Sequence, residues 1–237
     1  MDQLLVALDV DTPEEARRLA TTLRGAVGGF KIGSRLFTSH GPGIVEELVG
    51  LGDRVFLDLK FHDIPNQVAG AVSAATRLGV WMLNVHASGG LDMMRAARDA
   101  AEDAAVQMNM APPLVIAVTV LTSFDQTRLA AVGVTSPVTE QVERLAELAQ
   151  TAALDGVVAS PQEIALIRGR CGERFVIVTP GIRGQDDAKG DQQRTATAAD
   201  AVTAGASYLV VGRPILRAAD PRAAAERIAA SCRSVRR

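Results

Sequence analysis

The feature that most constrains the fold of this 237-residue chain is an end-to-end alternation of short, β-rich apolar runs with helical stretches. The strand-like runs are 4–10, 29–33, 55–61, 81–87, 114–121, 156–160, 175–182 and 208–215. The helical stretches are 12–25, 43–50, 65–79, 90–106, 125–131, 138–153, 161–170, 194–204 and 221–232. The runs are almost continuously apolar, as parallel strands buried on both faces must be. Eight such units predict an α/β chain with one domain, 1–237, folded as a closed (β/α)8 or TIM barrel.

The main alternative for a parallel α/β chain is an open, doubly wound sheet that binds a dinucleotide. Such a fold normally carries the glycine pattern G-x-G-x-x-G directly after its first strand. Here LDVDTPEE (8–15) occupies that place. The length also agrees with the roughly 250 residues of a typical barrel. The barrel is therefore favoured over the doubly wound sheet.

Charge and cysteine content exclude several classes of partner. The chain has 25 basic and 27 acidic residues and a net charge of −2, whereas nucleic-acid and anionic-membrane binders need a basic surplus. No apolar stretch is long enough to span a bilayer. Two cysteines, Cys171 and Cys232, suit a reducing compartment and are too few for a zinc site. We expect a cytoplasmic protein without nucleic-acid or membrane partners.

Lysine is scarce, which draws attention to where it occurs. Only Lys31, Lys60 and Lys189 are lysines among the 25 basic residues. Lys31 and Lys60 both lie in apolar strand-like runs. An ammonium can give up a proton, which a guanidinium cannot do at neutral pH. These two lysines are therefore candidates for proton chemistry.

Charged residues gather at the expected carboxyl ends of the first three strands, where barrel active sites lie. Asp9 follows the first strand, Lys31 lies in the second, Asp58 and Lys60 close the third, and Asp63 follows in the next loop. Asp58 and Lys60 are two residues apart, so alternation predicts that their side chains share one face of the strand. Burying several charges is costly unless they are paired. We therefore predict a functional cluster of alternating sign.

The loops after the last two strands carry a second pattern, TPGIRG (179–184) and VVGRPI (210–215). Each segment pairs a glycine with an arginine. In this fold these two loops form the recurrent phosphate site, because glycine lets backbone N–H groups approach and arginine matches phosphate oxygens. The pattern predicts a phosphorylated substrate.

The segment DLKFHDIPN (58–66) resembles the D-x-K-x-x-D-I-P-N signature of the bacterial orotidine 5′-phosphate decarboxylases. The resemblance extends over the chain, since LLVALDV, FKIG, VTVLTS, VTPGIR and VVGRPI follow in the family's order. It implies decarboxylation of orotidine 5′-phosphate (OMP) to UMP, the last step of pyrimidine synthesis, without a cofactor or metal. A related magnesium-dependent phosphosugar decarboxylase or aldolase, or a nucleotide-binding barrel without activity, is the alternative.

Carried over residue by residue, the resemblance implies that Lys60 donates a proton, that Asp58 faces the substrate carboxylate, and that Lys31 holds Asp58 and the ribose. Asp63 would enter the active site of the other subunit of a homodimer. The further implied substrate contacts are Asp9, Ile64, Gln67, Thr122, Ser123, Arg183, Gln192, Gly212 and Arg213. Gln67 stands where the family usually has threonine, and Gly184 where it usually has proline.

Two further observations concern residues outside the signature. Asn84 lies toward the polar end of the fourth strand, from which it can touch the charged cluster. The three histidines, His40, His62 and His86, are too dispersed in the sequence to predict a metal site.

Overall fold

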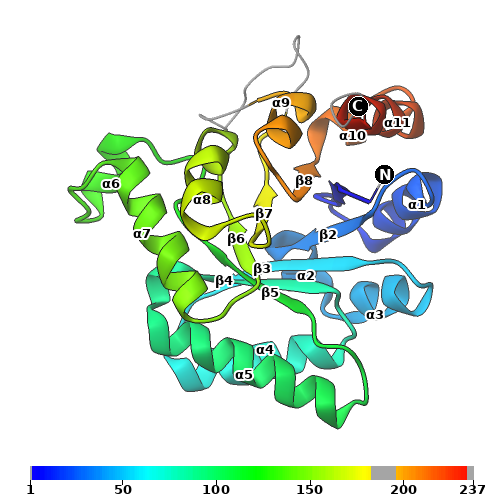
Figure 1. The fold of residues 1–237 in the computed structure, drawn as a ribbon. Coiled ribbons are helices and arrows are strands. Elements are labelled where there is room, and N and C mark those ends of the chain that lie inside the picture. The colour runs from blue at the N-terminus through cyan, green and yellow to red at the C-terminus, as the bar shows by residue number, and fades with distance from the viewer. Residues whose placement is uncertain (1, 183–195, 234–237) are drawn as a thin grey trace.

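All eight strand-like runs form parallel strands of one closed barrel in a computed structural model of the chain, which describes residues 2–182 and 196–233 (Figure 1). The strands are β1 (Leu4–Ala7), β2 (Gly29–Gly33), β3 (Val55–Phe61), β4 (Met82–His86), β5 (Leu114–Val118), β6 (Gly156–Val158), β7 (Val176–Thr179) and β8 (Tyr208–Val211). Each strand pairs with the next along the chain, and β8 closes the ring by pairing with β1. The predicted (β/α)8 barrel is confirmed.

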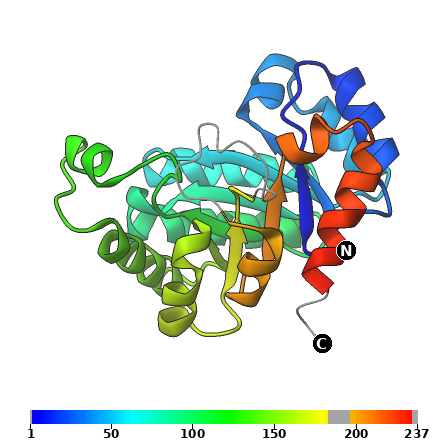
Figure 2. The same ribbon diagram turned by 90° about the horizontal axis from the view of Figure 1, so that it is seen from above.

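Helices surround the barrel and connect its strands (Figures 1 and 2). They are α1 (Pro13–Leu23), α2 (Ser34–His40), α3 (Gly43–Gly50), α4 (Pro65–Arg77), α5 (Leu91–Gln107), α6 (Gln126–Ala131), α7 (Val138–Thr151), α8 (Ile164–Cys171), α9 (Ala198–Thr203), α10 (Arg213–Leu216) and α11 (Pro221–Arg233), with 3-10 turns at Ala87–Gly89 and Pro161–Glu163. The segment that carries α6 extends away from the barrel in both views.

Local sequence explains why the first helix begins where it does. Thr12 precedes α1 in an extended conformation, and its side chain accepts a hydrogen bond from the backbone N–H of Glu15. Pro13 occupies the first turn, where its missing N–H costs nothing. The helix then buries Leu19 and Leu23 against the barrel. The same capping logic places α6 after Asp125, whose side chain accepts from the N–H of Arg128.

The apolar residues form two layers because strand side chains alternate between the two faces of the sheet. The outward-facing residues pack against the helices in the main hydrophobic core, which includes Leu57 of β3 and Leu83 of β4. The inward-facing residues fill the barrel itself; they are Leu5, Ala7, Phe56, Met82, Ile116, Val178 and Val210. Asp58 follows Phe56 and Asn84 follows Met82 on this inward face. The barrel interior is therefore apolar below and polar toward the carboxyl ends.

The structure differs from the sequence prediction at two short helices. Helix α2 begins directly after β2, although only α3 was expected in that connection; its apolar content is small, and Leu36 is its buried residue. Helix α10 begins within the segment 208–215 that was expected to be strand, and it ends just beyond it at Leu216. Gly212 precedes that helix, and Pro214 falls in its first turn, where proline suits a helix better than a strand.

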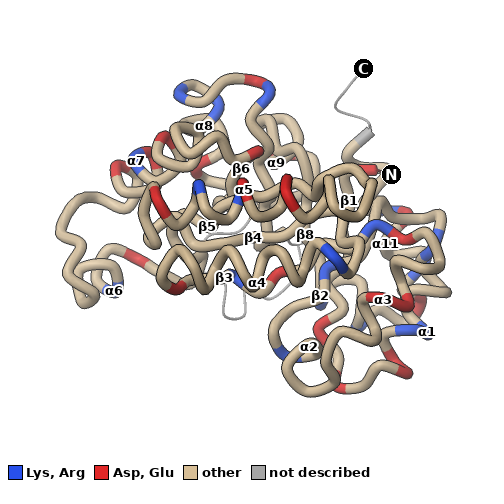
Figure 3. Tube along the Cα trace, turned by 90° about the horizontal axis from the view of Figure 1, so that it is seen from below, with Lys and Arg blue, Asp and Glu red and all other residues tan. Residues whose placement is uncertain are grey.

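Basic and acidic residues are both spread over the outer helices, as Figure 3 shows from below. This distribution agrees with the near-neutral charge of the chain. Among residues 2–182 and 196–233, none of the helices combines the length and apolar character that crossing a bilayer requires.

Candidate active site

A cavity of about 760 Å³ opens at the carboxyl ends of the strands. Its apolar floor is the upper part of the barrel interior, including Phe56, Val178 and Val210. The sequence-predicted residues that line it are Asp9, Lys31, Asp58, Lys60, Thr122, Gly212 and Arg213. The structure thus brings to one cavity part of the predicted phosphate site and four of the five residues of the predicted charged cluster, all except Asp63.

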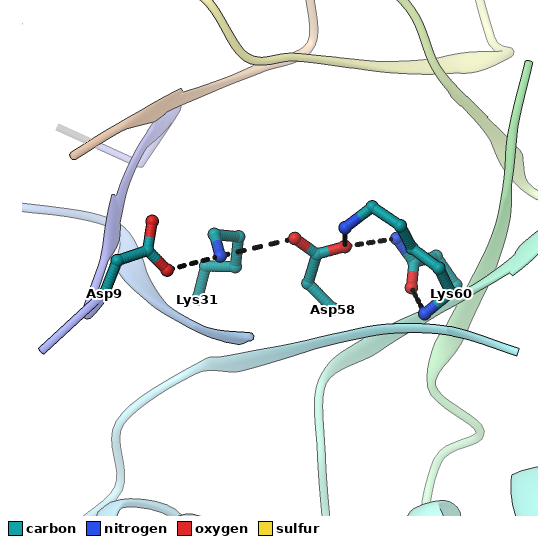
Figure 4. A network of polar contacts seen from close by, with 5 residues as sticks. Asp9, Lys31, Asp58 and Lys60 are labelled. Carbon is teal, nitrogen blue, oxygen red and sulfur yellow. Dashed lines mark hydrogen bonds and ion pairs between the residues drawn. The ribbon is translucent and has the colours of Figure 1, made fainter. Parts of the chain in front are cut away.

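Four side chains cross one wall of this cavity as a continuous row of alternating charge (Figure 4). The Nζ atom of Lys31 lies 3.0 Å from Oδ1 of Asp9 and 3.3 Å from Oδ2 of Asp58. The Nζ atom of Lys60 lies 2.6 Å from Oδ1 of Asp58. The row therefore runs Asp9, Lys31, Asp58, Lys60, and we call it the charged row. A charge-neutral row of this kind can be partly buried, because each charge has an opposite neighbour.

The row is buried at its centre and open at its ends. The side chains of Lys31 and Asp58 are 10% and 12% exposed, whereas those of Asp9 and Lys60 are 55% and 36% exposed. Lys60 is the ammonium that a ligand in the cavity can approach. Lys31 is enclosed between the two carboxylates.

Burial and pairing act in opposite directions on the two central groups. Burial lowers the pKa of Lys31, but the attraction of Asp58 and Asp9 outweighs it, and the net pKa is raised. Burial raises the pKa of Asp58, but Lys31 and Lys60 outweigh it, and the net pKa is lowered. Both groups therefore carry their charges at neutral pH.

The absence of a side chain at Gly33 leaves room for the ion pair between Lys31 and Asp9. A Cβ atom at Gly33 would lie 3.0 Å from Nζ of Lys31 and 3.4 Å from Oδ1 of Asp9. Any side chain there would press on the ion pair between these two residues. The glycine that ends β2 is thus explained by the close approach of Lys31 to Asp9.

The backbone at Lys60 departs from the regular strand that the sequence predicts. Lys60 has a φ of 54°, a left-handed conformation that costs a non-glycine residue about 1–2 kcal/mol. The pairing of β3 with β4 shifts between Leu57 and Phe61, so β3 bulges there. Asp58 and Lys60 do meet on one side, but simple strand alternation is the wrong reason. The bulge brings the ammonium back over the carboxylate.

Asn84 forms hydrogen bonds with both Asp58 and Lys60, the residues at this bulge. Its Nδ2 atom donates to Oδ1 of Asp58 at 2.7 Å, and its Oδ1 atom accepts from the backbone N–H of Lys60 at 2.8 Å. The expectation that Asn84 can touch the cluster is confirmed.

The loops after β7 and β8 form another part of the cavity wall, and because β8 pairs with β1, Gly212 lies next to the Asp9 end of the charged row. Pro180, Gly181, Gly212 and Arg213 line this part of the wall. Gly181 has a φ of 81°, which only glycine adopts readily. Arg183 and Gln192, the other predicted phosphate contacts, lie outside the described residues, as does Gly184.

Some predicted contacts do not line the cavity of their own chain. Asp63, Ile64 and Gln67 are exposed beyond the end of β3, and Ile64 is 63% exposed. Ser123 is also exposed and lies outside the cavity wall, although its neighbour Thr122 is part of it.

The sequence analysis missed a group of charged residues at the cavity mouth. Asp11, Glu15, Arg35 and Arg217 line the cavity, and Arg35 forms an ion pair with Asp11. Arg35 belongs to the unpredicted helix α2. The sequence feature that could have indicated this group is Asp11, which follows Asp9 by two residues just after the first strand.

Two of the three histidines are closer than their separation in the sequence suggested. The ring centroids of His62 and His86 are 5.5 Å apart. Burial lowers the pKa of His86, and His62 and Lys60 add to that effect. No group of three metal-ligating His, Cys, Asp or Glu side chains occurs within residues 2–182 and 196–233.

Comparison with known proteins gives one consistent result. A model of the "Orotidine 5′-phosphate decarboxylase / HUMPS family" matches residues 2–228. Orotidine 5′-phosphate decarboxylase from Moorella thermoacetica is 52% identical over 236 residues, covering 99% of this chain and 94% of that protein. The enzyme of the same name from Saccharophagus degradans is 53% identical, covering 96% of this chain and 94% of that protein. Among solved structures, orotidine 5′-phosphate decarboxylase from Lactobacillus acidophilus superposes with a TM-score of 0.87 at 36% identity, covering 98% of this chain and 99% of that chain.

Proposed function

The chain belongs to the orotidine 5′-phosphate decarboxylase / HUMPS family, and on that premise we propose that it converts OMP to UMP and carbon dioxide without a metal or organic cofactor. The observation that carries this proposal is the charged row, in which an accessible Lys60 lies 2.6 Å from a buried Asp58 at the wall of the cavity. Such a pair combines a proton donor with a fixed negative charge.

The reaction breaks the bond between C6 of the pyrimidine and the carboxylate carbon. The electron pair remains on C6 in the plane of the ring, where no π-system can absorb it. We propose that the Lys60 ammonium stabilises this carbanion and then transfers a proton from Nζ to C6. Carbon dioxide leaves, and the neutral amine of Lys60 regains a proton from solvent. Arginine could not supply that proton readily, because its pKa is far higher.

Magnitudes show that Lys60 cannot act alone. A reaction of this difficulty needs a barrier reduction of about 20 kcal/mol or more. One ammonium about 4 Å from a developing anion supplies about 4 kcal/mol at an effective dielectric constant near 20. Most of the remainder has to come from binding energy and from the fixed charges around the reacting carbon.

Asp58 and the phosphate loops supply the remainder in this proposal. The substrate carboxylate would lie beside Asp58, where repulsion raises the energy of the bound substrate and disappears as neutral carbon dioxide forms. Binding of the phosphate by Gly212, Arg213 and the loop after β7 would offset that repulsion. Asp9 and Lys31 would contact the ribose, and Thr122 the pyrimidine.

We further propose a cytoplasmic homodimer in which the single domain contributes residues to two active sites. Asp63, Ile64 and Gln67 follow β3 but are exposed and lie outside the cavity of their own chain. That position supports a role in the cavity of a second copy. Mixing an inactive Lys60→Ala protein with an inactive Asp63→Ala protein would test it, since hybrid dimers would regain one intact site.

The proposed reaction is tested by following the absorbance of OMP with purified protein in EDTA, beside the Lys60→Ala variant. We expect rapid conversion by the wild type and loss of nearly all turnover in the variant, with modest change in UMP binding. A variant that kept more than about a tenth of wild-type turnover, a barrier change of about 1.4 kcal/mol, would contradict the role of Lys60. Inactivity toward OMP, with activity on a phosphosugar when magnesium is added, would contradict the proposed substrate.

A further inference from the structure

The position of the Lys60 ammonium depends on an irregular piece of backbone. The φ of 54° and the register shift of β3 against β4 turn the chain back at Lys60. A bulge of this kind leaves a backbone N–H without its partner in the sheet. Something outside the regular ladder must satisfy that N–H and hold the turn.

Asn84 is placed to do so. It belongs to β4, next to β3 in the barrel, and it is completely buried. It lies on the inward-facing side of β4, one layer above Met82, in a strand that is otherwise apolar up to His86. A buried amide in such a strand is costly unless all its polar atoms are paired.

The two polar atoms of the Asn84 amide bind the two residues of the proposed reaction, Lys60 and Asp58. The carbonyl oxygen accepts from the backbone N–H of Lys60 at 2.8 Å, and the amide nitrogen donates to Oδ1 of Asp58 at 2.7 Å. That same oxygen of Asp58 receives the ammonium of Lys60 at 2.6 Å. One neutral side chain therefore fixes both the backbone that carries the proton donor and the carboxylate beside it.

We propose that Asn84 is a positioning residue for the decarboxylation, an inference that rests on the proposed function. When Lys60 gives its proton to the substrate it becomes a neutral amine, and its ion pair with Asp58 is lost. The Asn84 amide does not titrate and Asp58 stays ionised in that step, so both hydrogen bonds of Asn84 persist through it. Asn84 then holds Asp58 in place and keeps Lys60 in its left-handed conformation until the ammonium is restored.

The residue type follows from the same geometry. The site needs one donor toward Asp58 and one acceptor toward the N–H of Lys60, which the amide of asparagine supplies in fixed directions. A carboxylate would supply the acceptor but repel Asp58. A protonated carboxyl group would supply both the donor and the acceptor, because its O–H can donate to Asp58 while its other oxygen accepts from the N–H of Lys60. An Asn84→Asp variant therefore carries a pH signature that no general loss of packing would produce.

The test measures kcat and KM for OMP over about pH 5.5 to 8 in the wild type, Asn84→Ala, Asn84→Asp and a matched control, Asn109→Asp. Asn109 is exposed beyond the end of α5, on the connection to the amino end of β5, and has a φ of 52° that aspartate tolerates. Circular dichroism establishes that each variant is folded at the assay temperature. The near-isosteric Asn84→Asp decides the question if Asn84→Ala does not fold.

For Asn84→Ala we expect kcat to fall by up to about 100-fold with little change in KM, because a misplaced catalytic group affects the chemical step. For Asn84→Asp we expect a larger loss at high pH. Its kcat relative to the wild type should rise at least about tenfold toward pH 5.5, as burial and Asp58 raise the pKa of the introduced carboxyl. Asn109→Asp should follow the wild type at every pH.

Two outcomes would overturn the inference while leaving the proposed function intact. One is a folded Asn84→Ala protein with kcat within about twofold of an active wild type. The other is a kcat ratio for Asn84→Asp that does not change with pH. A wild type that does not convert OMP would instead overturn the proposed function and this inference together.

Discussion

The two ends of the barrel use opposite charges in different ways. At the amino end, Arg24 makes a two-pronged contact with Asp53, with Nε 2.9 Å from one carboxylate oxygen and Nη2 2.6 Å from the other. Nearby, the Arg54 guanidinium lies 5.4 Å from the ring centroid of Trp81. At the carboxyl end, the charged row uses lysines, each of which meets carboxylates through a single nitrogen atom.

The two kinds of ion pair suit different roles: the arginine contact stabilises the fold, and the lysine contact can take part in a reaction. A planar guanidinium matches a carboxylate along two bonds and stays charged, which suits a permanent contact. An ammonium is a compact charge that can turn between partners and give up a proton. The chain therefore has a lysine, Lys60, where a proton is proposed to move, and an arginine, Arg24, at this permanent contact of the amino end. Exchanging the two residue types is the most direct way to test this comparison.

The largest effect is expected from Lys60→Arg, which keeps the positive charge but removes a ready proton donor. We expect kcat for OMP to fall by about 1,000-fold or more, within the range attributed to general acids. The measurement is OMP absorbance at saturating substrate, with circular dichroism to establish folding. A kcat within about tenfold of the wild-type value would mean that a positive charge at this position is sufficient for turnover, without a ready proton donor.

A smaller effect is expected from Arg213→Ala, which removes a charge from the part of the cavity wall that follows β8. We expect kcat/KM to fall by about 10- to 100-fold, as for loss of a hydrogen bond to a charged partner. Because phosphate binding is proposed to offset the repulsion at Asp58, kcat at saturation should fall as well. An unchanged kcat would show that Arg213 contributes to binding alone.

The third prediction concerns the pH dependence of stability in Asp58→Asn. The pKa of Asp58 is lowered in the folded chain, so its ionisation stabilises the fold above the unfolded value near 3.9, and this contribution is lost as pH falls through the folded pKa. We expect the variant to be about 1–3 kcal/mol less stable than the wild type at pH 7. Urea unfolding should show that deficit shrinking below about pH 4. A deficit that stays constant to low pH would contradict ionic stabilisation by Asp58.

The smallest effect is expected from Arg24→Lys at the amino end. Replacing the two-pronged contact with a single one should cost about 0.5–1 kcal/mol of stability, seen as a fall in Tm of about 1–4 °C. The kcat for OMP should remain within about twofold of the wild type, because Arg24 is far from the cavity. A large loss of activity would connect the two ends of the barrel and undermine the comparison.

The strands and the charged row were predictable because both depend on short-range patterns. Each strand is an apolar run, and parallel strands place their carboxyl ends together, so Asp9, Lys31 and Asp58 could be assigned to one rim. The structure also places Gly212 and Arg213 at the cavity, as the loops after β7 and β8 predicted.

The missed features depend on relations between segments that periodicity does not contain. No glycine in the sequence marks the bulge at Lys60, and the hydrogen bond that satisfies its backbone N–H comes from Asn84 on another strand, β4. The approach of His62 to His86 likewise joins a loop to the end of a neighbouring strand. Helix α2 was not predicted because its sequence, SRLFTSH, has only Leu36 and Phe37 as apolar residues.

Closure of the barrel has a consequence for how the cavity meets its ligand. The pairs β1 with β8 and β4 with β5 are both hydrogen-bonded, so the strands that carry the charged row and the strand that precedes Gly212 and Arg213 belong to one closed ring. The entropy of aligning these groups is lost when the chain folds, before any ligand arrives. A rigid substrate whose length fails to match the spacing on this ring between Lys60 and Arg213 cannot engage both residues at once, and discrimination by molecular length is thus inherent in the topology.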